Sequence, residues 1–269
     1  MDLSHAMQGA VNWLAAVPVV KQAGRRASRR RFERNRDANL FFGVFDSFEA
    51  AAASAPQSRP VGYDNSASAD LYASNIFPSD YPAMFWLAKS FSEGLRSVFD
   101  LGGHVGIKYY AFRRTLSYPQ ALIWTVCDVP AVVARGRELA LARAPEGALH
   151  FTDRYAEASG FDVLYASGSL QYLPLPLSQL LSDLPRLPRR LVINTTPIHA
   201  TRSFFTLNSI GTAFCPYRVQ AHDSFVDSLI ALGYEKRGEW ENTGKAMRIP
   251  FEPAYDVPHY SGFCFDLKA

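Results

Sequence analysis

Short apolar runs alternate with longer helix-like segments from residue 97 onward. Ser97–Leu101 and Ile123–Cys127 are runs of strand length, and an acid stands at or near the end of each. A helix-like segment follows each run, and the second, Pro130–Ala144, has its proline in the first turn, where the missing N–H costs nothing. Runs that are apolar on both faces and are followed by helices are typical of strands inside a parallel sheet. The pattern predicts an α/β fold.

The same alternation continues to the end of the chain. Val163, Leu164 and Tyr165 form the centre of a strand predicted to be buried on both faces. Further strands are predicted at Ala148–Phe151, Arg190–Ile193, Tyr234–Glu241 and Gly262–Leu267. Further helices are predicted at Tyr81–Glu93, Leu177–Leu184 and Ser224–Leu232. In the first of these helices, Met84, Phe85, Leu87 and Phe91 are predicted core residues. The Phe- and Thr-rich stretch Thr201–Tyr217 is predicted to be an insertion that covers a ligand pocket.

The N-terminal part of the chain has a different character. We expect residues 1–60 to form a helical, basic extension and residues 61–269 to form the main domain. Residues 1–20 are predicted to be a short amphipathic helix broken near Pro18. Lys21–Arg36 then holds one lysine and seven arginines against Glu33 alone. Two interpretations are open: a solvated helical face, or a docking surface for an acidic carrier protein or an anionic lipid.

Composition excludes several classes of protein. The formal charge of +3 is too small to indicate nucleic acid. Three widely spaced cysteines, without a CxxC pair or a histidine cluster, predict neither a disulfide scaffold nor a metal site and fit a reducing cytoplasm. No apolar run is long enough for a transmembrane segment, and residues 1–20 lack the basic start of a signal peptide.

The first strand continues into a glycine-rich turn, Asp100–Gly106. Glycine is favoured where the backbone must approach a ligand or adopt positive φ, so Gly102, Gly103 and Gly106 indicate a ligand-binding loop or a purely structural turn. His104 stands among them, and histidine tolerates left-handed φ better than most residues. Its imidazole is predicted either to pack only or to touch a ligand.

Acidic and polar side chains follow the next strands. Asp128 is placed to accept hydrogen bonds from a ribose, to cap the helix that starts at Pro130, or to do both. Asp153, after Thr152, is either an adenine contact or a turn-forming residue. Ser167–Tyr172 either lines the site or caps the next helix, and Asn194 and His199 end another strand at the same edge. Tyr63, in the loop 56–68, is either a lid residue or a face for a cationic ligand.

Three segments together resemble the motif series of class I S-adenosylmethionine-dependent methyltransferases. They are Asp-Leu-Gly-Gly-His-Val-Gly at 100–106, Cys-Asp-Val-Pro-Ala-Val-Val at 127–133, and Phe-Asp-Val-Leu-Tyr-Ala-Ser-Gly-Ser-Leu-Gln-Tyr-Leu at 161–173. The second is similar to the Asp-Leu-Pro-x-Val-Ile of small-molecule O-methyltransferases. Over residues 40–269 the chain resembles a methyltransferase-like family met in bacterial polysaccharide and secondary-metabolite gene clusters. His104 departs from the pattern, because the usual loop has glycine there.

The resemblance implies a Rossmann-like fold with a seven-stranded, mostly parallel sheet, helices on both faces and an antiparallel last strand. It implies S-adenosylmethionine as methyl donor or substrate. The cofactor-binding residues it implies are Tyr63, Asp100, Gly102, Gly103, His104, Gly106, Asp128, Val129, Thr152, Asp153 and Ser167. The catalytic residues it implies are Tyr165, Ser167, Ser169, Gln171, Tyr172, Asn194 and His199. If a general base is needed, His199 and His222 are the candidates, because imidazole titrates near neutrality.

Several functions are compatible with this cofactor site. The first is methyl transfer to a small molecule or carrier-bound metabolite in bacterial secondary metabolism. The second is cyclisation of S-adenosylmethionine to azetidine-2-carboxylate and methylthioadenosine, which needs no acceptor. The third is a catalytically silent cofactor-binding module. A nicotinamide dehydrogenase is disfavoured because the full G-x-G-x-x-G spacing is absent.

Overall fold

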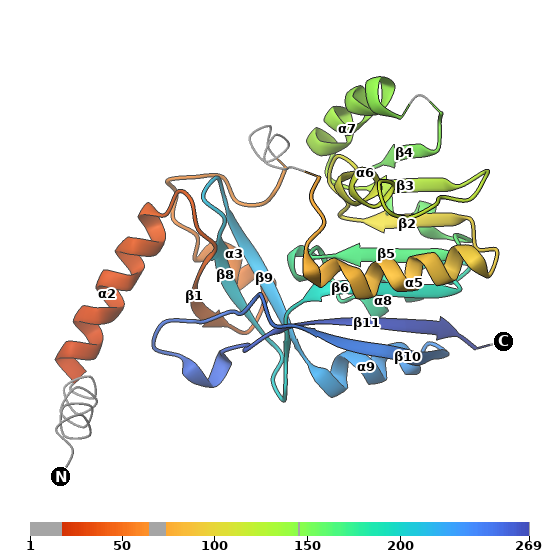
Figure 1. Cartoon of the computed structure of the whole chain (residues 1–269). Helices are drawn as coiled ribbons and strands as arrows, with labels where there is room; N and C mark the ends of the chain where they lie inside the picture. Colours follow the sequence, from red (N-terminus) through yellow and green to blue (C-terminus); the bar gives the residue numbers. More distant parts are fainter. Residues whose placement is uncertain (1–17, 65–73, 145, 269) are drawn as a thin grey trace, which may run out of the picture.

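A seven-stranded sheet forms the centre of the computed structural model, which describes residues 18–64, 74–144 and 146–268 (Figure 1). Its strand order is β10-β11-β6-β5-β2-β3-β4. The strands are β2 (Ser97–Leu101), β3 (Ile123–Cys127), β4 (Leu149–Thr152), β5 (Val163–Ser167), β6 (Arg190–Thr196), β10 (Tyr234–Asn242) and β11 (Tyr260–Leu267). Each strand predicted from the sequence is present, within a few residues of its expected bounds.

The strand directions confirm the predicted topology. Strands β2 to β6 pair in parallel, and β11 is antiparallel to both β6 and β10. From β2 the chain moves outward to β3 and β4, then returns to the other side of β2 with β5. The order therefore reverses between β2 and β5, and ligands of open α/β sheets bind outside the carboxyl ends of the strands at such a point.

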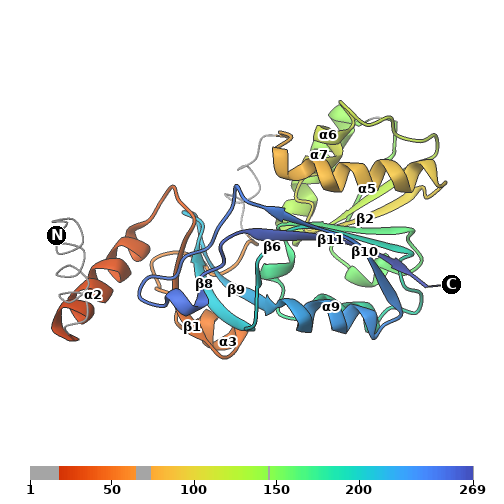
Figure 2. The same ribbon diagram turned by 60° about the horizontal axis from the view of Figure 1, so that its bottom comes forward.

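Helices cover both faces of this sheet, as expected for a doubly wound fold (Figures 1 and 2). One face packs on α5 (Tyr81–Ser92), α6 (Ile107–Phe112) and α7 (Pro130–Arg143), and the other on α8 (Leu177–Ser182) and α9 (His222–Ile230). Val163, Leu164 and Tyr165 are completely buried between the layers, which confirms their predicted position. In α5, Met84 and Leu87 are buried, but the core prediction for Phe85 is wrong, because its side chain is 60% exposed.

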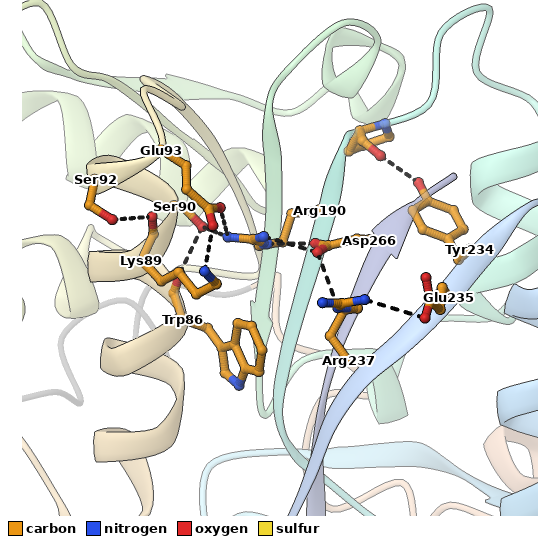
Figure 3. A network of polar contacts seen from close by, with 11 residues as sticks. Trp86, Lys89, Ser90, Ser92, Glu93, Arg190, Tyr234, Glu235, Arg237 and Asp266 are labelled. Carbon is orange, nitrogen blue, oxygen red and sulfur yellow. Dashed lines mark hydrogen bonds and ion pairs between the residues drawn. The ribbon is translucent and has the colours of Figure 1, made fainter. Parts of the chain in front are cut away.

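A buried guanidinium joins α5 to two strands of the sheet (Figure 3). It lies at the end of the sheet opposite the carboxyl ends of the parallel strands. Arg190, the first residue of β6, makes a two-pronged contact with Asp266 of β11 at 2.6 and 3.0 Å. It also contacts Glu93 at 2.9 Å and the Ser90 hydroxyl at 3.1 Å, both at the end of α5. Such fork-like pairs fix geometry as well as adding attraction. The network ties the end of α5 to β6 and β11 and contains none of the predicted site residues.

A second sheet stands beside the first and combines segments far apart in the sequence (Figure 1). Its order is β1-β8-β9-β7. The strands are β1 (Leu40–Phe45), β7 (Ile198–His199), β8 (Phe204–Ser209) and β9 (Phe214–Ala221), and α3 (Phe48–Ala53) packs on them. Part of the expected N-terminal extension thus pairs with the stretch predicted as an insertion, through Leu40 opposite Ser209.

The basic segment forms the helix α2 (Pro18–Arg34), which projects from the rest of the molecule (Figures 1 and 2). Its buried Phe32 stacks on Phe214 of β9 with ring centroids 5.3 Å apart and fixes its base to the second sheet. The amphipathic helix predicted before Pro18 lies outside the described residues. None of the helices in the described part of the chain is both long and apolar enough to cross a membrane.

Candidate functional site

A cavity of about 1310 Å³ lies at the carboxyl ends of β2, β3, β5 and β6, where the two sheets face each other. One wall is the edge of the large sheet. The opposite wall contains Phe48 of α3 and Cys215 and Pro216 of β9. Two loops complete it, residues 61–64 and 241–245, together with the segment 75–82. The fold thus forms this cavity at the point where the strand order reverses.

The glycine-rich turn lies so close to its neighbours that side chains could not replace two of its glycines. A Cβ on Gly103 would be 2.3 Å from Asp100 Oδ2, and a Cβ on Gly102, whose φ is +74°, would be 2.3 Å from Ser169 Cβ. His104 adopts φ +58°, the left-handed conformation expected of the turn. Its buried side chain lines the cavity.

Asp128 holds this turn with its own carboxylate. Oδ2 accepts the backbone N–H of His104 at 2.9 Å, and Oδ1 accepts that of Val129 at 2.8 Å. A carboxylate has about four lone-pair sites, so roughly two remain for a ligand in the cavity. Asp128 lines the cavity, but it does not cap the following helix, because the N-cap position of α7 is Val129 and no side chain caps it. Burial raises the pKa of the Asp128 carboxyl.

Asp100 is the second carboxyl of the cavity and is 1% exposed. Its Oδ2 accepts a hydrogen bond from Trp124 Nε1 at 3.0 Å. Burial raises its pKa to about 7, and the neighbouring Asp128 adds to the effect, while the Trp124 hydrogen bond opposes it. Asp100 can therefore exchange a proton near neutral pH.

The predicted site residues between Tyr165 and Tyr172 divide between the cavity lining and the core. Ser167, Ser169 and Tyr172 line the cavity, but Tyr165 and Gln171 do not. The Tyr165 side chain is fully buried in the core beside Trp124 and Phe112, and burial raises its pKa.

The side chains of Gln171 and Ser169 donate hydrogen bonds to backbone carbonyl groups. Gln171 donates to the Gly168 carbonyl at 2.7 Å, and the Ser169 hydroxyl donates to the Leu101 carbonyl. Ser167–Tyr172 therefore contributes lining residues, but it does not cap the next helix, because α8 has Pro176 at its N-cap and no side-chain cap.

Both candidate bases lie outside the cavity lining. His199 Nδ1 accepts the backbone N–H groups of Thr201 and Arg202, and its Nε2 is 3.1 Å from the Ala254 carbonyl. His222 lies on α9 between Asp223 and Glu239, each 2.9 Å away, and the hydrogen bond that its imidazole donates to Asp223 is the main cause that raises its pKa. Both histidines serve local structure.

Three predicted cofactor residues also lie outside the lining. Gly106 begins α6 with φ +87°. Thr152 is buried, and its carbonyl accepts the backbone N–H of Asp128 at 3.1 Å. Asp153, the next residue, is exposed.

A chain of polar groups beside the cavity joins Asn194, which the sequence indicated, to Asp80 and Lys108, which it did not. Lys108 Nζ donates to Asp80 Oδ2 at 2.7 Å, and Asn194 Nδ2 lies 3.4 Å from Asp80 Oδ1. Asn194 Oδ1 in turn accepts Trp240 Nε1–H at 3.1 Å. Asn194 is fully buried and does not line the cavity, but Asp80 and Lys108 do. The chain ties the segment 75–82 to α6 and to two strands.

A cluster of tyrosines extends from the cavity lining into the core: Tyr63 and Tyr172 line the cavity, and Tyr217 and Tyr260 are buried. Tyr63 packs edge-on against Tyr172 with centroids 4.8 Å apart, and Tyr172 packs edge-on against Tyr217 at 5.0 Å. The Tyr217 and Tyr260 hydroxyls are 2.7 Å apart, and the Tyr172 hydroxyl donates to Asn208 Oδ1 at 3.1 Å. Of these residues the sequence indicated Tyr63 and Tyr172.

Replacing Asp100 by asparagine should make the protein more stable at neutral pH. The asparagine side chain would keep an oxygen for Trp124, but it cannot ionise. The pKa of Asp100 is 3.8 in the unfolded chain and about 7 in the folded protein. At pH values between these two, the folded state therefore keeps the Asp100 proton that the unfolded state has lost. The wild-type free energy of unfolding therefore falls as pH rises through that window.

The advantage of the Asp100→Asn variant should accordingly be small near pH 4 and reach about 2–4 kcal/mol above pH 7. Urea unfolding of both proteins without cofactor, at several pH values, measures this difference. A difference that does not change with pH would contradict the raised pKa.

No protein-family model matches the chain, and no curated protein matches its sequence. Solved structures share part of its architecture. The 1,6-didemethyltoxoflavin-N1-methyltransferase of Burkholderia thailandensis is 16% identical, over 71% of this chain and 79% of its own, with a TM-score of 0.46. Magnesium protoporphyrin IX methyltransferase of Synechocystis PCC 6803, with bound S-adenosylmethionine, is 15% identical over 70% and 79%, with a TM-score of 0.45.

The CcbJ methyltransferase of Streptomyces caelestis covers more of the chain, 83% against 97% of its own length, at 14% identity and a TM-score of 0.44. These similarities are distant, but the strand order of the large sheet identifies the fold. Five parallel strands with the reversal beside β2 are followed by a last strand inserted antiparallel between β6 and β10. The chain has the class I methyltransferase fold.

Proposed function

We propose that the protein is an S-adenosylmethionine-dependent methyltransferase that acts on a small molecule or a carrier-bound metabolite. The observation that supports this most is a cavity with two different ends, one built from the glycine turn and two acids and the other from the opposite wall with Phe48, Cys215 and Pro216. Its volume of about 1310 Å³ exceeds the roughly 300–1,000 Å³ typical of a site for one small molecule. A cofactor and an acceptor fit the two ends.

The first end suits S-adenosylmethionine group by group. We assign the free lone pairs of Asp128 to the ribose hydroxyls and Val129 to the adenine face. The backbone of Gly102 and Gly103 would lie against the cofactor, and Asp100 would face its ammonium group. The Tyr63 and Tyr172 rings are proposed to face the sulfonium, because an aromatic face attracts a cation.

Chemistry at the second end needs little beyond positioning. The acceptor nucleophile attacks the methyl carbon, the S–CH₃ bond breaks, and S-adenosylhomocysteine leaves. Holding the nucleophile in line at near-attack distance supplies much of the acceleration. Ser167, Ser169 and Tyr172 line the cavity where the acceptor would meet the methyl group. No histidine base is required for an acceptor that arrives with a free electron pair.

One observation favours cyclisation of the cofactor as a second candidate. The α-ammonium must lose a proton before its nitrogen can form a bond to the γ-carbon, as the bond from that carbon to sulfur breaks and methylthioadenosine leaves. Asp100, with a pKa of about 7, is a carboxyl able to take this proton at neutral pH. The product would be azetidine-2-carboxylate.

Incubation with S-adenosylmethionine separates these functions. Methyl transfer predicts S-adenosylhomocysteine only when an acceptor is added, and a panel of phenols, amines and carboxylic acids provides candidates. Cyclisation predicts methylthioadenosine and azetidine-2-carboxylate from the cofactor alone. Mass spectrometry identifies both sets of products. Tight binding without either product would leave a catalytically silent cofactor-binding module.

Loss of the Asp128 carboxylate should weaken cofactor binding. Asp128→Ala is expected to lower the affinity for S-adenosylhomocysteine by about 1–3 kcal/mol, because charged hydrogen-bond partners of the ribose are lost. Calorimetric titration measures the change. Asp183→Ala, at an exposed acid after α8, is the matched control and should bind as the wild type does. Unchanged affinity in Asp128→Ala would remove this residue from the site.

The exposed face of α2 is proposed to dock an acidic carrier protein. Arg26, Arg30 and Arg34 follow one another at intervals of four and are exposed, so they share one face of the helix. On the neighbouring stripe, Arg25 pairs with Glu252 and Arg29 pairs with Glu33, each at 2.8 Å. The three arginines form a charged surface on a projecting helix.

Reversing these charges should abolish docking. The triple variant of Arg26, Arg30 and Arg34 to Glu is expected to lose at least tenfold in affinity for an acyl carrier protein, with wild-type binding weakening as salt rises. The control reverses Arg186 and Arg189, which are exposed on another part of the molecule. Equal losses in both variants, or no binding by the wild type, would contradict docking at α2.

A further inference from the structure

Lys245 is a cation in the cavity wall that has no counter-ion in the described part of the protein. It lies in the loop after β10, is half-buried and lines the cavity. Its Nζ is 4.9 Å from the centroid of the Tyr260 ring. Within the described ranges this ring contact is the one interaction its ammonium makes, without a hydrogen bond or an ion pair.

The other principal charged groups of the cavity are already engaged. Lys108 pairs with Asp80 at 2.7 Å, and Glu241 lies 3.4 Å from His259. Asp128 accepts two backbone N–H groups, and Asp100 accepts the Trp124 indole N–H. Of the two lysines that line the cavity, Lys108 has a counter-ion, and Lys245 has none among the described residues.

An anion at this position would relieve an unfavourable situation. Burial lowers the pKa of the Lys245 ammonium, which means that its charged form is poorly solvated there. A carboxylate of a ligand would supply both the missing charge and the missing hydrogen-bond acceptors. The ring of Tyr260 favours the charged form and fixes the direction of the side chain.

The surroundings of Lys245 suggest the shape of this ligand. The Tyr260 hydroxyl meets that of Tyr217, and Tyr217 packs against Tyr172. This row of rings runs from Lys245 to the residues after β5, which we assign to the transferred methyl group. Tyr217 and Tyr260 are buried beneath the wall, and Tyr172 is the member of this row that lines the cavity. An apolar body packed against the Tyr172 ring would extend an anionic group toward Lys245 and hold its nucleophile beside the residues after β5.

We propose that Lys245 binds a carboxylate of the acceptor, so that the second substrate of this enzyme is an apolar or aromatic carboxylic acid. The inference rests on the proposed methyltransferase function and specifies its substrate class. A carboxylate at Lys245 could also be that of the cofactor's methionine part. The experiment therefore separates the two sources.

Paired acids and amides test the proposal on the full-length protein saturated with S-adenosylhomocysteine. The probes are benzoate against benzamide and indole-3-acetate against indole-3-acetamide, with binding followed by ligand-observed NMR. We expect each acid to bind the wild type at least tenfold more tightly than its amide. The preference should disappear in Lys245→Met and persist in Lys245→Arg, which keeps the charge. Lys236→Met, at an exposed lysine of β10 outside the cavity lining, is the control and should keep it.

Cofactor affinity distinguishes the remaining outcomes. S-adenosylhomocysteine carries the methionine carboxylate and 5′-methylthioadenosine lacks it, so Lys245→Met should bind both as the wild type does. Loss of affinity for the first alone would assign Lys245 to the cofactor and overturn the proposal. Equal or absent binding of acid and amide to the wild type would also overturn it, while leaving the cofactor site intact. Failure of the wild type to bind S-adenosylhomocysteine would instead refute the proposed function itself.

Discussion

The close approach of one backbone turn to two carboxyl groups is the constraint on which the site depends. The turn after β2 passes within van der Waals contact of Asp100, which only glycine at position 103 permits. Its next peptide group donates to Asp128 from the neighbouring strand. The backbone, rather than any long side chain, therefore sets the distance between the two acids. A turn held in this way presents both acids at one edge of the cavity.

The two acids differ in what burial does to them. Asp128 is half-buried and satisfied by two N–H groups that fix its orientation, whereas Asp100 has one donor and a pKa near neutrality. A buried acid that exchanges its proton near pH 7 costs stability in the empty protein. A cationic ligand would offset that cost. The same imbalance recurs with the opposite sign at Lys245 of the cavity lining, whose ammonium forms no ion pair among the described residues.

The two ends of the cavity come from differently constructed parts of the molecule. The large sheet is assembled from strands that follow one another along the chain, and the Arg190 network ties the end of α5 to two of them, β6 and β11 (Figure 3). The second sheet joins β1 to β8 and β9, so a segment near the start of the chain completes the cavity wall opposite the large sheet. This wall therefore exists only after distant segments have paired.

The sequence by itself determined the large sheet, the turn and the two acids, because strand runs, glycines and acids at strand ends are signals carried by a few adjacent residues. It also placed Ser167, Ser169 and Tyr172 at the cavity. Only the tertiary structure decided that Asn194 is buried, that His199 serves a loop, and that Phe85 is exposed. The contacts of Asp80 with Lys108 and Asn194, like the position of Lys245 over Tyr260, join residues that no sequence period relates. Such contacts follow from the packing of whole elements, and a local pattern contains no information about the partner that packing will supply.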